Sequence, residues 1–432
     1  MFVLSGIGKT KLDGHKDLTK DKPIKVIEAP DSVFVPIVVG QDPNFDVHVQ
    51  VGDKVYVGTK LATRKSLYTP LYSPVSGEVK AIVKRMHASG RMQQHIEIIN
   101  DHKYESVKAL DVANPDELTG KEIVNCMKEL GLIGLGGSGF PSFMKYTKPE
   151  GINLIIVNGV ECEPYITSDH VSMMRDAAAL FDGVEFLMKA GECDKAVICI
   201  KEHKPDLKAL LESEAANHNG IEVKIVPDRY PMGWERTLVK EVTGKDYDRL
   251  PGEVGVNVNN ASTAIALSKG IRNGEAITKR VVTFSGDALN DPQNVEVCVG
   301  TPVNYIVQQI GGYKDDVAQG VVLNGGPMMG GSVPQDTFVI TPYTNAITVL
   351  EKVDQPAMPC LKCGYCIEYC PSGLQPVKMM MAEKAGDAEK LQKLEVMRCV
   401  TCGMCSYICP SKIEVTDFVS KGKRRAMAAM KK

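Results

Sequence analysis

Short apolar runs separated by turn residues dominate the first hundred positions of the chain. Residues 33–39 form one such run, and further runs lie at 51–55, 57–62 and 73–79. Runs of this length between Gly, Pro, Asp and Ser residues are typical of β-strands. The pattern predicts a β domain over residues 1–103.

The spacing of the apolar positions changes after Asn114-Pro115. Asp116 can cap a helix whose apolar positions share one face, at Ile123, Val124, Met127 and Leu130. Strand-like runs then alternate with helical stretches; the runs lie at 152–157, 196–200 and 221–226, and the helices at 173–190 and 205–215. This alternation indicates a largely parallel α/β sheet, which we assign to residues 104–278.

Residues 279–352 return to a strand-rich pattern around one helix. The strand-like runs lie at 280–284, 295–299, 321–323 and 347–350, and the helix at 303–310. This mixture favours a small β-grasp-like domain. In the remaining part, residues 353–432, a helical stretch covers 377–395 and a basic tail begins at Lys421. We expect the tail to be a solvated helix end or to touch a membrane or an acidic partner.

Two copies of one cysteine pattern lie in this last part of the chain. They read Cys360-x2-Cys363-x2-Cys366-x3-Cys370-Pro371 and Cys399-x2-Cys402-x2-Cys405-x3-Cys409-Pro410. In the bacterial run with this spacing, three close thiolates hold one [4Fe–4S] cluster and the fourth ligates the other cluster. The pattern assigns Cys360, Cys363, Cys366 and Cys409 to a first cluster, and Cys399, Cys402, Cys405 and Cys370 to a second. The alternative is a pair of structural zinc sites, which the repetition of two complete quartets disfavours.

A glycine-rich run, residues 131–141, follows the first predicted helix. Gly134, Gly136 and Gly139 satisfy G-x-G-x-x-G, but this dinucleotide fingerprint counts only after a strand and before a helix. The run is therefore either a flexible turn or a loop whose backbone N–H groups close on a phosphate. A polar and acidic segment, residues 158–164, follows the strand at 152–157, where open α/β sheets place ligands.

Composition narrows the class of protein. A length of 432 residues suggests about three domains, and 44% hydrophobic with 24% charged residues is ordinary for a globular protein. The net charge of −2 gives no general attraction to nucleic acid. Five of the 13 cysteines lie outside the two quartets without a pattern, which indicates reduced thiols in a reducing compartment. The opening segment lacks the apolar core of a secretory signal, and no apolar run approaches the roughly 20 residues that span a bilayer.

Taken together, these features make the chain resemble the RnfC family, a subunit of the Rnf ion-translocating electron-transport complex. That family is related to the flavin-bearing, NADH-binding subunit of respiratory complex I. The resemblance is carried by GLIGLGGSGFPSFMK (131–145), NGVECEPYITSDH (158–170), NNAST (259–263), GDALNDPQNVEVCVGTPV (286–303), NGGPMMGG (324–331) and both cysteine motifs. The N-terminal phrases VGDKVYVGTKLA and SPVSGEVKAI resemble the barrel-sandwich hybrid of biotinyl and lipoyl domains, without the lysine that carries their prosthetic group.

The resemblance implies a multidomain α/β protein with four parts. These are a barrel-sandwich-like N-terminal β domain, a Rossmann-like α/β domain for FMN and NADH, a β-grasp-like (SLBB-like) domain and a C-terminal α-helical ferredoxin-type domain with two [4Fe–4S] clusters. FMN would be a bound cofactor and NADH the substrate. The residues placed at their site are Gly134, Gly136, Gly137, Gly139, Phe140, Lys145, Asn158, Glu161, Glu163, Glu235, Asn259, Asn260 and Thr263.

The resemblance also implies a role for each group of these residues. The glycines and Lys145 would lie along the flavin phosphate, and Phe140 would form an aromatic wall. The side chains facing the isoalloxazine and the nicotinamide would be Asn158, Glu161 and Glu163. The flavin pocket would be completed by Asn259, Asn260 and Thr263, with Glu235 near the NADH ribose.

Three positions depart from the complex I relatives. Val160 stands where they have a carboxylate that touches the flavin, and Trp234 replaces a small or acidic residue before Glu235. Lys148 lies near the place of a second stacking aromatic. These changes lie outside the cysteine motifs, so they do not affect the cluster prediction. They leave open whether NADH is the electron donor.

A flavin is needed between NADH and the clusters, because NADH delivers two electrons as hydride and a [4Fe–4S] cluster takes one. The resemblance implies an Rnf subunit that oxidises NADH through FMN and passes electrons through the first and then the second cluster. The acceptors would be partner subunits and, indirectly, ferredoxin or flavodoxin, with coupling to ion transport. No catalytic acid or nucleophile is required. The protein would be peripheral on the cytoplasmic side of the cell membrane, with neither a transmembrane segment nor a nucleic-acid partner.

Two other functions are kept open by the sequence. One is a soluble adaptor with the same scaffold and a donor other than NADH, feeding a reductase such as an amino-acid reductase. Trp234 and Val160 favour that alternative. The other is a non-catalytic binding or scaffold module whose glycine run has lost its flavin.

Overall fold

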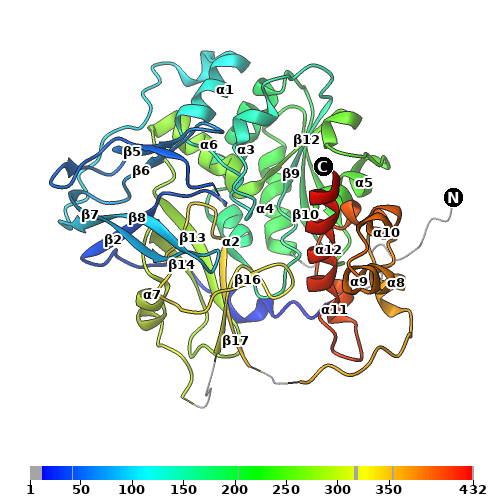
Figure 1. The fold of residues 1–432 in the computed structure, drawn as a ribbon. Coiled ribbons are helices and arrows are strands. Elements are labelled where there is room, and N and C mark those ends of the chain that lie inside the picture. Colours follow the sequence, from blue (N-terminus) through cyan, green and yellow to red (C-terminus); the bar gives the residue numbers. More distant parts are fainter. Residues whose placement is uncertain (1–11, 41, 203, 316–319, 353–354, 431–432) are drawn as a thin grey trace.

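The computed structural model describes residues 12–40, 42–202, 204–315, 320–352 and 355–430. Four units follow one another along the chain and pack together (Figure 1). Residues 1–11, part of the opening segment in which we expected no secretory signal, lie outside the described residues. In the described parts, no helix is both long enough and apolar enough to cross a bilayer.

Two antiparallel sheets enclose the core of the N-terminal unit. One has the order β2-β8-β7-β4, with bounds Ser32–Pro36, Met92–Asn100, Gly77–Met86 and Lys54–Val55. The other has the order β3-β5-β6, with bounds Phe45–Val47, Lys60–Arg64 and Thr69–Tyr72. Alternate residues such as Val33 and Val35 in β2, and Ile96 and Ile98 in β8, are buried in one shared cluster. Two sheets that each bury one face form the sandwich predicted for this part of the chain.

The chain before β2 lies outside that sandwich. β1 (Lys25–Val26) pairs in parallel with β14 (Gln293–Cys298) of the third unit. The short helix η1 (Lys16–Leu18) lies against the α/β unit. The sequence does not predict that β1 joins the third unit, because a two-residue strand is too short to produce an alternating pattern.

A parallel sheet of the order β11-β10-β9-β12 forms the second unit, with bounds Ile221–Val226, Ala196–Lys201, Leu154–Asn158 and Val256–Asn260. Its central residues Ile155, Ile156 and Val157 are fully buried, as expected where helices cover both faces. The helices are α1 (Gly120–Glu129), α2 (Ser168–Arg175), α3 (Ala177–Ala190), α4 (Pro205–Ala215), α5 (Glu235–Thr243) and α6 (Ala261–Asn273). The predicted parallel α/β arrangement is confirmed. Strand β12 lacks an apolar run, because three of its five residues are asparagine, a residue depleted in strands.

Helix α1 begins later than predicted. The Thr119 side chain accepts a hydrogen bond from the Glu122 amide, and the Glu122 carboxylate accepts one from the Thr119 amide. This capping box makes Thr119 the N-cap. Asp116, the predicted cap, lies in the preceding short helix Pro115–Glu117 instead.

A mixed sheet forms the third unit, in the order β1-β14-β13-β17-β15-β16. The new elements are β13 (Lys279–Ser285), α7 (Val303–Gln309), β15 (Gly320–Asn324), β16 (Gly331–Ser332) and β17 (Ala346–Glu351). β13 and β14 form a hairpin, and β17 runs parallel to β13 in the middle of the sheet. The predicted strands and helix are confirmed within two residues, and the β-grasp-like identity stays a prediction.

Four short α-helices and one long α-helix, α12, make up the C-terminal unit as the structure describes it. They are α8 (Tyr365–Glu368), α9 (Pro376–Lys384), α10 (Ala388–Lys393), α11 (Met404–Tyr407) and α12 (Val415–Met430). The helical stretch predicted over 377–395 consists of two helices, α9 and α10. Gly386, at φ +71°, follows α9 and separates it from α10. The basic tail is the last part of α12, whose Val419 and Ala426 are buried in the core of this unit. Residues 431 and 432 lie outside the described residues.

The close contact between α3 and α6 in the α/β unit generates a stability prediction. A Cβ at Gly183 in α3 would lie 2.0 Å from the carbonyl oxygen of Ala264 in α6. Gly183→Ala should therefore force the two helices apart and lower the free energy of unfolding by about 1–3 kcal/mol. The fluorescence of Trp234, the only tryptophan, reports unfolding of this unit in urea.

Gly252→Ala is the matched control for that experiment. A Cβ there meets only Ile152 Cδ1 at 3.9 Å, an ordinary contact. We expect a change within about 0.5 kcal/mol. Equal urea midpoints for the two variants would contradict the packing argument.

Candidate functional site

The carboxyl ends of β9 and β12 form the edge at which the predicted polar segments meet. Asn158 ends β9, Asn260 ends β12, and the two residues are partners in the parallel register. Residues 158–166, here called the ECEP segment, leave β9, while α6 begins directly after β12. Ligands bind at this edge in open parallel sheets.

The glycine run is a loop between α1 and the short helix η3 (Ser142–Lys145), folded back on itself. The Gly134 amide donates to the Phe140 carbonyl at 2.8 Å, and the Gly139 amide donates to the Gly134 carbonyl at 3.0 Å. Phe140 remains 42% exposed at the end of the loop. The fold of the loop thus leaves one predicted aromatic side chain accessible.

Gly136 and Gly137 form the part of this loop that is open to a ligand. Gly137 has φ +100° and open space at its Cβ position, while a Cβ on Gly136 would lie 2.9 Å from Asn260 Nδ2. Among the described residues, neither amide finds a hydrogen-bond acceptor. Free adjacent amides in a glycine loop are the donors that an anion takes, so this part fits a phosphate.

Asn260 also offers an unused polar atom. Its Nδ2 donates to Asp169 Oδ2 at 2.7 Å, whereas its buried Oδ1 has no partner within the described chain. Burial raises the pKa of Asp169, and the Asn260 and Ser262 side chains oppose that shift by donating to the carboxylate. An orphaned buried carbonyl beside two free amides is consistent with a polar ligand group at this edge.

The side chains of Lys145, Asn259 and Thr263 bond to neighbouring parts of the protein and do not point into open space. Lys145 Nζ donates to the Val258 carbonyl at 2.6 Å, and Asn259 Nδ2 donates to the Tyr146 hydroxyl at 2.5 Å. Thr263 Oγ1 accepts from the Leu135 amide at 3.0 Å. Burial lowers the pKa of Lys145. All three side chains are engaged in fixing the loop against β12 and α6.

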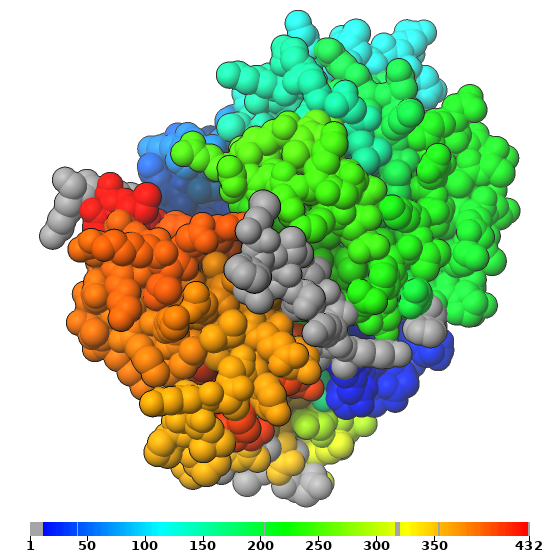
Figure 2. Space-filling model, turned by 90° about the vertical axis from the view of Figure 1, so that its right-hand side faces the viewer, coloured from blue at the N-terminus to red at the C-terminus, as the bar shows by residue number. Residues whose placement is uncertain are grey.

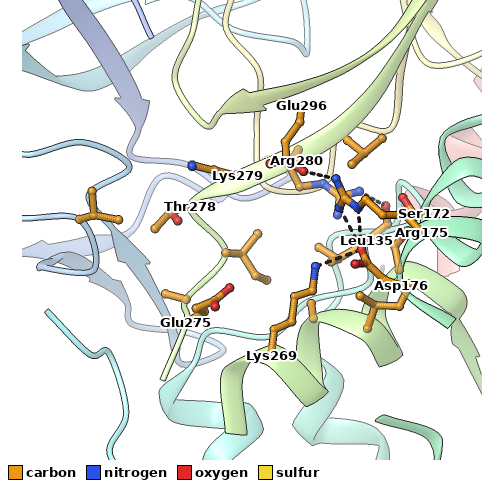
Figure 3. Close-up of a pocket in the computed structure, with 17 residues that line it drawn as sticks. Leu135, Ser172, Arg175, Asp176, Lys269, Glu275, Thr278, Lys279, Arg280 and Glu296 are labelled. Carbon is orange, nitrogen blue, oxygen red and sulfur yellow. Dashed lines mark hydrogen bonds and ion pairs between the residues drawn. The ribbon is translucent and has the colours of Figure 1, made fainter. Parts of the chain in front are cut away.

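A polar cavity of about 360 Å³ lies behind the glycine loop (Figure 3). Arg280, buried in β13, reaches across it and donates to the Leu135 carbonyl at 3.0 Å. Lys269 and Arg175 both pair with Asp176. None of the predicted site residues lines this cavity. Arg280 thus connects the loop to the third unit. Ser262, which also lines the cavity, donates to Asp169 and so adjoins the edge of the sheet.

Glu161 is the centre of a buried charge cluster. Its side chain is 3% exposed and accepts from the Asp169 amide at 2.8 Å. Lys204 Nζ lies 3.5 Å and Lys16 Nζ 3.9 Å from its Oε2. Burial lowers the pKa of Lys16 to about 8 despite the nearby Glu161 carboxylate. The cluster stiffens the ECEP segment from both the N-terminal chain and α4.

Glu163 connects the ECEP segment to the third unit. Its carboxylate accepts from the amides of Met329 at 2.7 Å and Met328 at 3.2 Å. Burial raises the pKa of Glu163 to about 7, although both amide bonds favour the ionised form. The NGGPMMGG segment is therefore held at the same edge of the sheet.

Asn158 contacts the loop before α5, and Glu235 begins the helix that follows this loop. Asn158 Nδ2 donates to the Gly233 carbonyl at 2.8 Å. Glu235 opens α5 and accepts from the Tyr247 hydroxyl at 3.0 Å. Trp234 precedes Glu235 in the chain, and its buried indole N–H finds no partner in the part that the structure describes. The predicted Asn158 and Glu235 thus flank one loop.

The eight cysteines of the two motifs line two cavities. Cys360, Cys363, Cys366 and Cys409, the outer quartet, line an apolar cavity of about 240 Å³. Cys370, Cys399, Cys402 and Cys405, the inner quartet, line a cavity of about 20 Å³. Each set joins three cysteines of one motif with the fourth of the other, the arrangement that crossed ligation of two clusters requires.

The chemistry of the inner quartet suits a metal cluster. Burial raises the pKa of the Cys402 and Cys405 thiols to about 12. Thiolates at such positions need a compensating positive charge, which iron supplies. The described residues hold no group of three or more His, Cys, Asp or Glu side chains close enough for a single metal ion. The sulfurs surround cavities instead.

The two quartets differ in their distance from the α/β unit. Tyr230, 3% exposed, donates from its hydroxyl to the Cys402 carbonyl at 2.6 Å. Val400, Cys402 and Met404 share an apolar cluster with Tyr230, Trp234 and Met328. Cys363 of the outer quartet is exposed, and Figure 2 shows the segment around residues 355–370 at the outer surface. The inner quartet is therefore the one that faces the ECEP segment.

Several residues at this site have no predicted role. Lys16, Lys204 and Arg280 support the site from distant parts of the chain, and no pattern in the sequence connects them with it. Asp169 stands within the segment 158–170, so its position in that segment is a signal that could have identified it. Tyr230 lies close to Trp234 in the chain, but nothing in the sequence relates it to the cysteines.

Three family matches cover separate parts of the chain. Residues 127–269 match the Nuo51 FMN-binding domain. Residues 6–103 match the RnfC barrel sandwich hybrid domain, and residues 359–413 match the 4Fe-4S dicluster domain. The chain thus carries an FMN-binding domain and a [4Fe–4S] dicluster domain.

A solved structure shares the fold of most of the chain. It is an NAD+-reducing [NiFe]-hydrogenase in the air-oxidized state, with a TM-score of 0.51 at 18% identity. The match covers 71% of this chain and 63% of that chain. At this identity the likeness shows the fold alone.

Similar known proteins belong to ion-translocating complexes. The C subunit of the proton-translocating ferredoxin:NAD(+) oxidoreductase complex of Clostridium ljungdahlii is 33% identical, over 84% of this chain and 81% of its own length. The C subunit of the ion-translocating oxidoreductase complex of Rhodobacter capsulatus is 32% identical, over 89% and 76%. The C subunit of the same name from Serratia proteamaculans is 31% identical over 85% of this chain. The match spans only 53% of the length of that protein. The chain belongs to the RnfC family of subunits in Rnf-type ion-translocating oxidoreductase complexes.

Proposed function

We propose that this chain is the electron-input subunit of an Rnf-type complex, oxidising NADH at its FMN domain and delivering single electrons to partner subunits. The observation that carries the proposal is the direct packing of the inner cysteine quartet against the ECEP segment and its neighbours. FMN, when bound, accepts the electron pair of NADH and releases electrons singly. The chain's own residues bind, orient and shield the cofactors.

The proposed FMN and NADH site contains the residues predicted from the sequence. Gly136, Gly137 and the Oδ1 of Asn260 would contact the ligands directly, because their polar atoms find no partner among the described residues. The loop supports would be Gly134, Gly139, Lys145, Asn259 and Thr263. The remaining side chains at the edge are Phe140, Asn158, Glu161, Glu163 and Glu235.

The proposed cluster ligands are the outer quartet, Cys360, Cys363, Cys366 and Cys409, and the inner quartet, Cys370, Cys399, Cys402 and Cys405. The order expected from the sequence, first motif before second, is reversed in this proposal. Only the inner quartet touches the loops at the sheet edge within the described chain, while the exposed Cys363 belongs to the outer quartet. Electrons would therefore pass from the inner to the outer quartet.

The setting of the protein in the cell completes the proposal. We place it as a peripheral protein on the cytoplasmic side of the cell membrane, bound to membrane subunits that couple electron flow to ion transport. Ferredoxin or flavodoxin would exchange electrons with it through those subunits. The domains would be residues 1–103, 104–278, 279–352 and 353–432, with residues 279–352 forming a β-grasp (SLBB-like) domain.

A second candidate keeps the scaffold and changes the donor. Val160 is fully buried and offers no polar group where relatives have a carboxylate. Trp234 packs into the apolar cluster beside the inner quartet. Both observations favour a soluble adaptor that receives electrons from a donor other than NADH and feeds a reductase.

Reduction by NADH separates these two candidates. The purified chain is reconstituted anaerobically with FMN, iron and sulfide and titrated with NADH. Its oxidised-flavin absorbance and its cluster absorbance should both be lost by two equivalents of NADH, because FMN takes two electrons and each of the two clusters takes one. The control is dithionite, which should reduce both groups in either case. Flavin that dithionite reduces and NADH leaves oxidised would favour the adaptor.

The matched glycines of the two motifs test the order of the quartets. Gly364 and Gly403 occupy the same motif position, with φ +84° and +79°. A Cβ on Gly403 would lie 2.5 Å from the Met328 carbonyl oxygen, whereas a Cβ on Gly364 meets nothing within 4 Å. Each alanine substitution carries about 1–2 kcal/mol of positive-φ strain, and Gly403→Ala adds about 1–3 kcal/mol from the collision.

We expect Gly403→Ala to slow cluster reduction by the flavin, since it moves the inner quartet away from the α/β unit. Gly364→Ala should leave that rate close to wild type. Stopped-flow absorbance under anaerobic conditions measures both. A slower flavin-to-cluster step in Gly364→Ala alone would restore the order expected from the sequence.

A further inference from the structure

One buried hydrogen bond ties the inner quartet to the α/β unit. The Tyr230 hydroxyl donates to the Cys402 backbone carbonyl at 2.6 Å, and the two residues are 3% and 8% exposed. The surrounding side chains, Val400, Met404 and Trp234, are largely apolar. A dipole in such surroundings acts on its neighbours more strongly than it would in water.

A second contact fixes the same cysteine loop from the third unit. Gly403, the residue after Cys402, packs directly on the Met328 carbonyl. The amides of Met328 and Met329 in turn hold the Glu163 carboxylate. Cys402 is therefore fixed from two sides. Tyr230 shares its apolar cluster with Cys162 of the ECEP segment, and the Met328 segment bonds Glu163.

The outer quartet has no counterpart of these contacts in the described chain. Cys363 and Gly364 hold the positions that Cys402 and Gly403 hold in the second motif. A Cβ on Gly364 would meet open space. Among the described residues, the Cys363 carbonyl accepts no hydrogen bond from a tyrosine hydroxyl, unlike the Cys402 carbonyl. Two identical motifs thus receive different surroundings from the fold.

We propose that Tyr230 is a positioning residue that sets the reduction potential of the inner cluster above the value its motif alone would give. The O–H dipole points its positive end at the carbonyl of a ligating cysteine. Reduction adds negative charge to the cluster, and a nearby positive dipole end stabilises that charge. Hydrogen bonds around the ligands and burial are the means by which a protein tunes these potentials.

This proposal rests on the proposed role of Cys402 as a cluster ligand, and it requires no assumption about the donor. An EPR-monitored redox titration with dithionite, on the full chain reconstituted with both clusters, gives the two midpoint potentials. The outer cluster is identified by the signal that changes in Cys363→Ser. We expect Tyr230→Phe to shift the inner midpoint to lower potential and to leave the outer midpoint in place.

Tyr72→Phe is the matched control. Tyr72 is buried, and its hydroxyl likewise donates to a backbone carbonyl, that of Glu129 in α1, away from both cysteine quartets (Figure 1). Both substitutions remove one buried hydroxyl bond, so both should cost similar stability in thermal unfolding, and only Tyr230→Phe should change a potential.

Three outcomes would overturn the proposal. They are an unchanged inner midpoint in Tyr230→Phe, an equal shift in Tyr72→Phe, and a shift confined to the outer cluster. The NADH experiment is independent of all three. If NADH does not reduce the flavin, Tyr230→Phe can still show the predicted shift in the inner midpoint potential. If NADH does reduce the flavin, that shift can still be absent.

Discussion

The structure depends on hydrogen bonds to the backbone of the ECEP segment. This segment follows β9 and forms no helix or strand of its own. Lys16 Nζ donates to the carbonyls of Glu161, Glu163 and Ile166, and Asn158 Oδ1 accepts from the Val160 amide. Buried backbone groups without partners would cost too much free energy for such a loop to stay at the sheet edge. Lys16, in the chain before β1, supplies this donor.

The same segment brings charges into the interior and pairs them there. Glu161 lies near Lys204 and Lys16, while the Glu163 carboxylate takes two amides of the third unit. Removing one partner of a buried pair leaves an uncompensated charge, which is far more costly than the pair itself. Three units of the chain are thus held to one edge of the sheet by polar contacts that cannot be broken singly without loss of stability.

The two cysteine motifs have the same spacing but different neighbours in the fold. In one, Gly403 lies on the Met328 carbonyl and Cys402 accepts from Tyr230; in the other, Gly364 is open and Cys363 is exposed. The order of electron flow that we propose rests on this asymmetry of the fold around a repeated motif.

The sequence by itself determined the local elements and the chemistry of the cysteines. Apolar periodicity located α4 at Pro205–Ala215 and β11 at Ile221–Val226, because these patterns depend on neighbours along the chain. Motif spacing likewise predicted which cysteines would group. The tertiary structure alone decided that Thr119 caps α1, that β1 joins the third sheet, that Lys16 and Arg280 support the site, and that the second motif faces the α/β unit. These outcomes depend on contacts between distant residues, which leave no periodicity in the sequence.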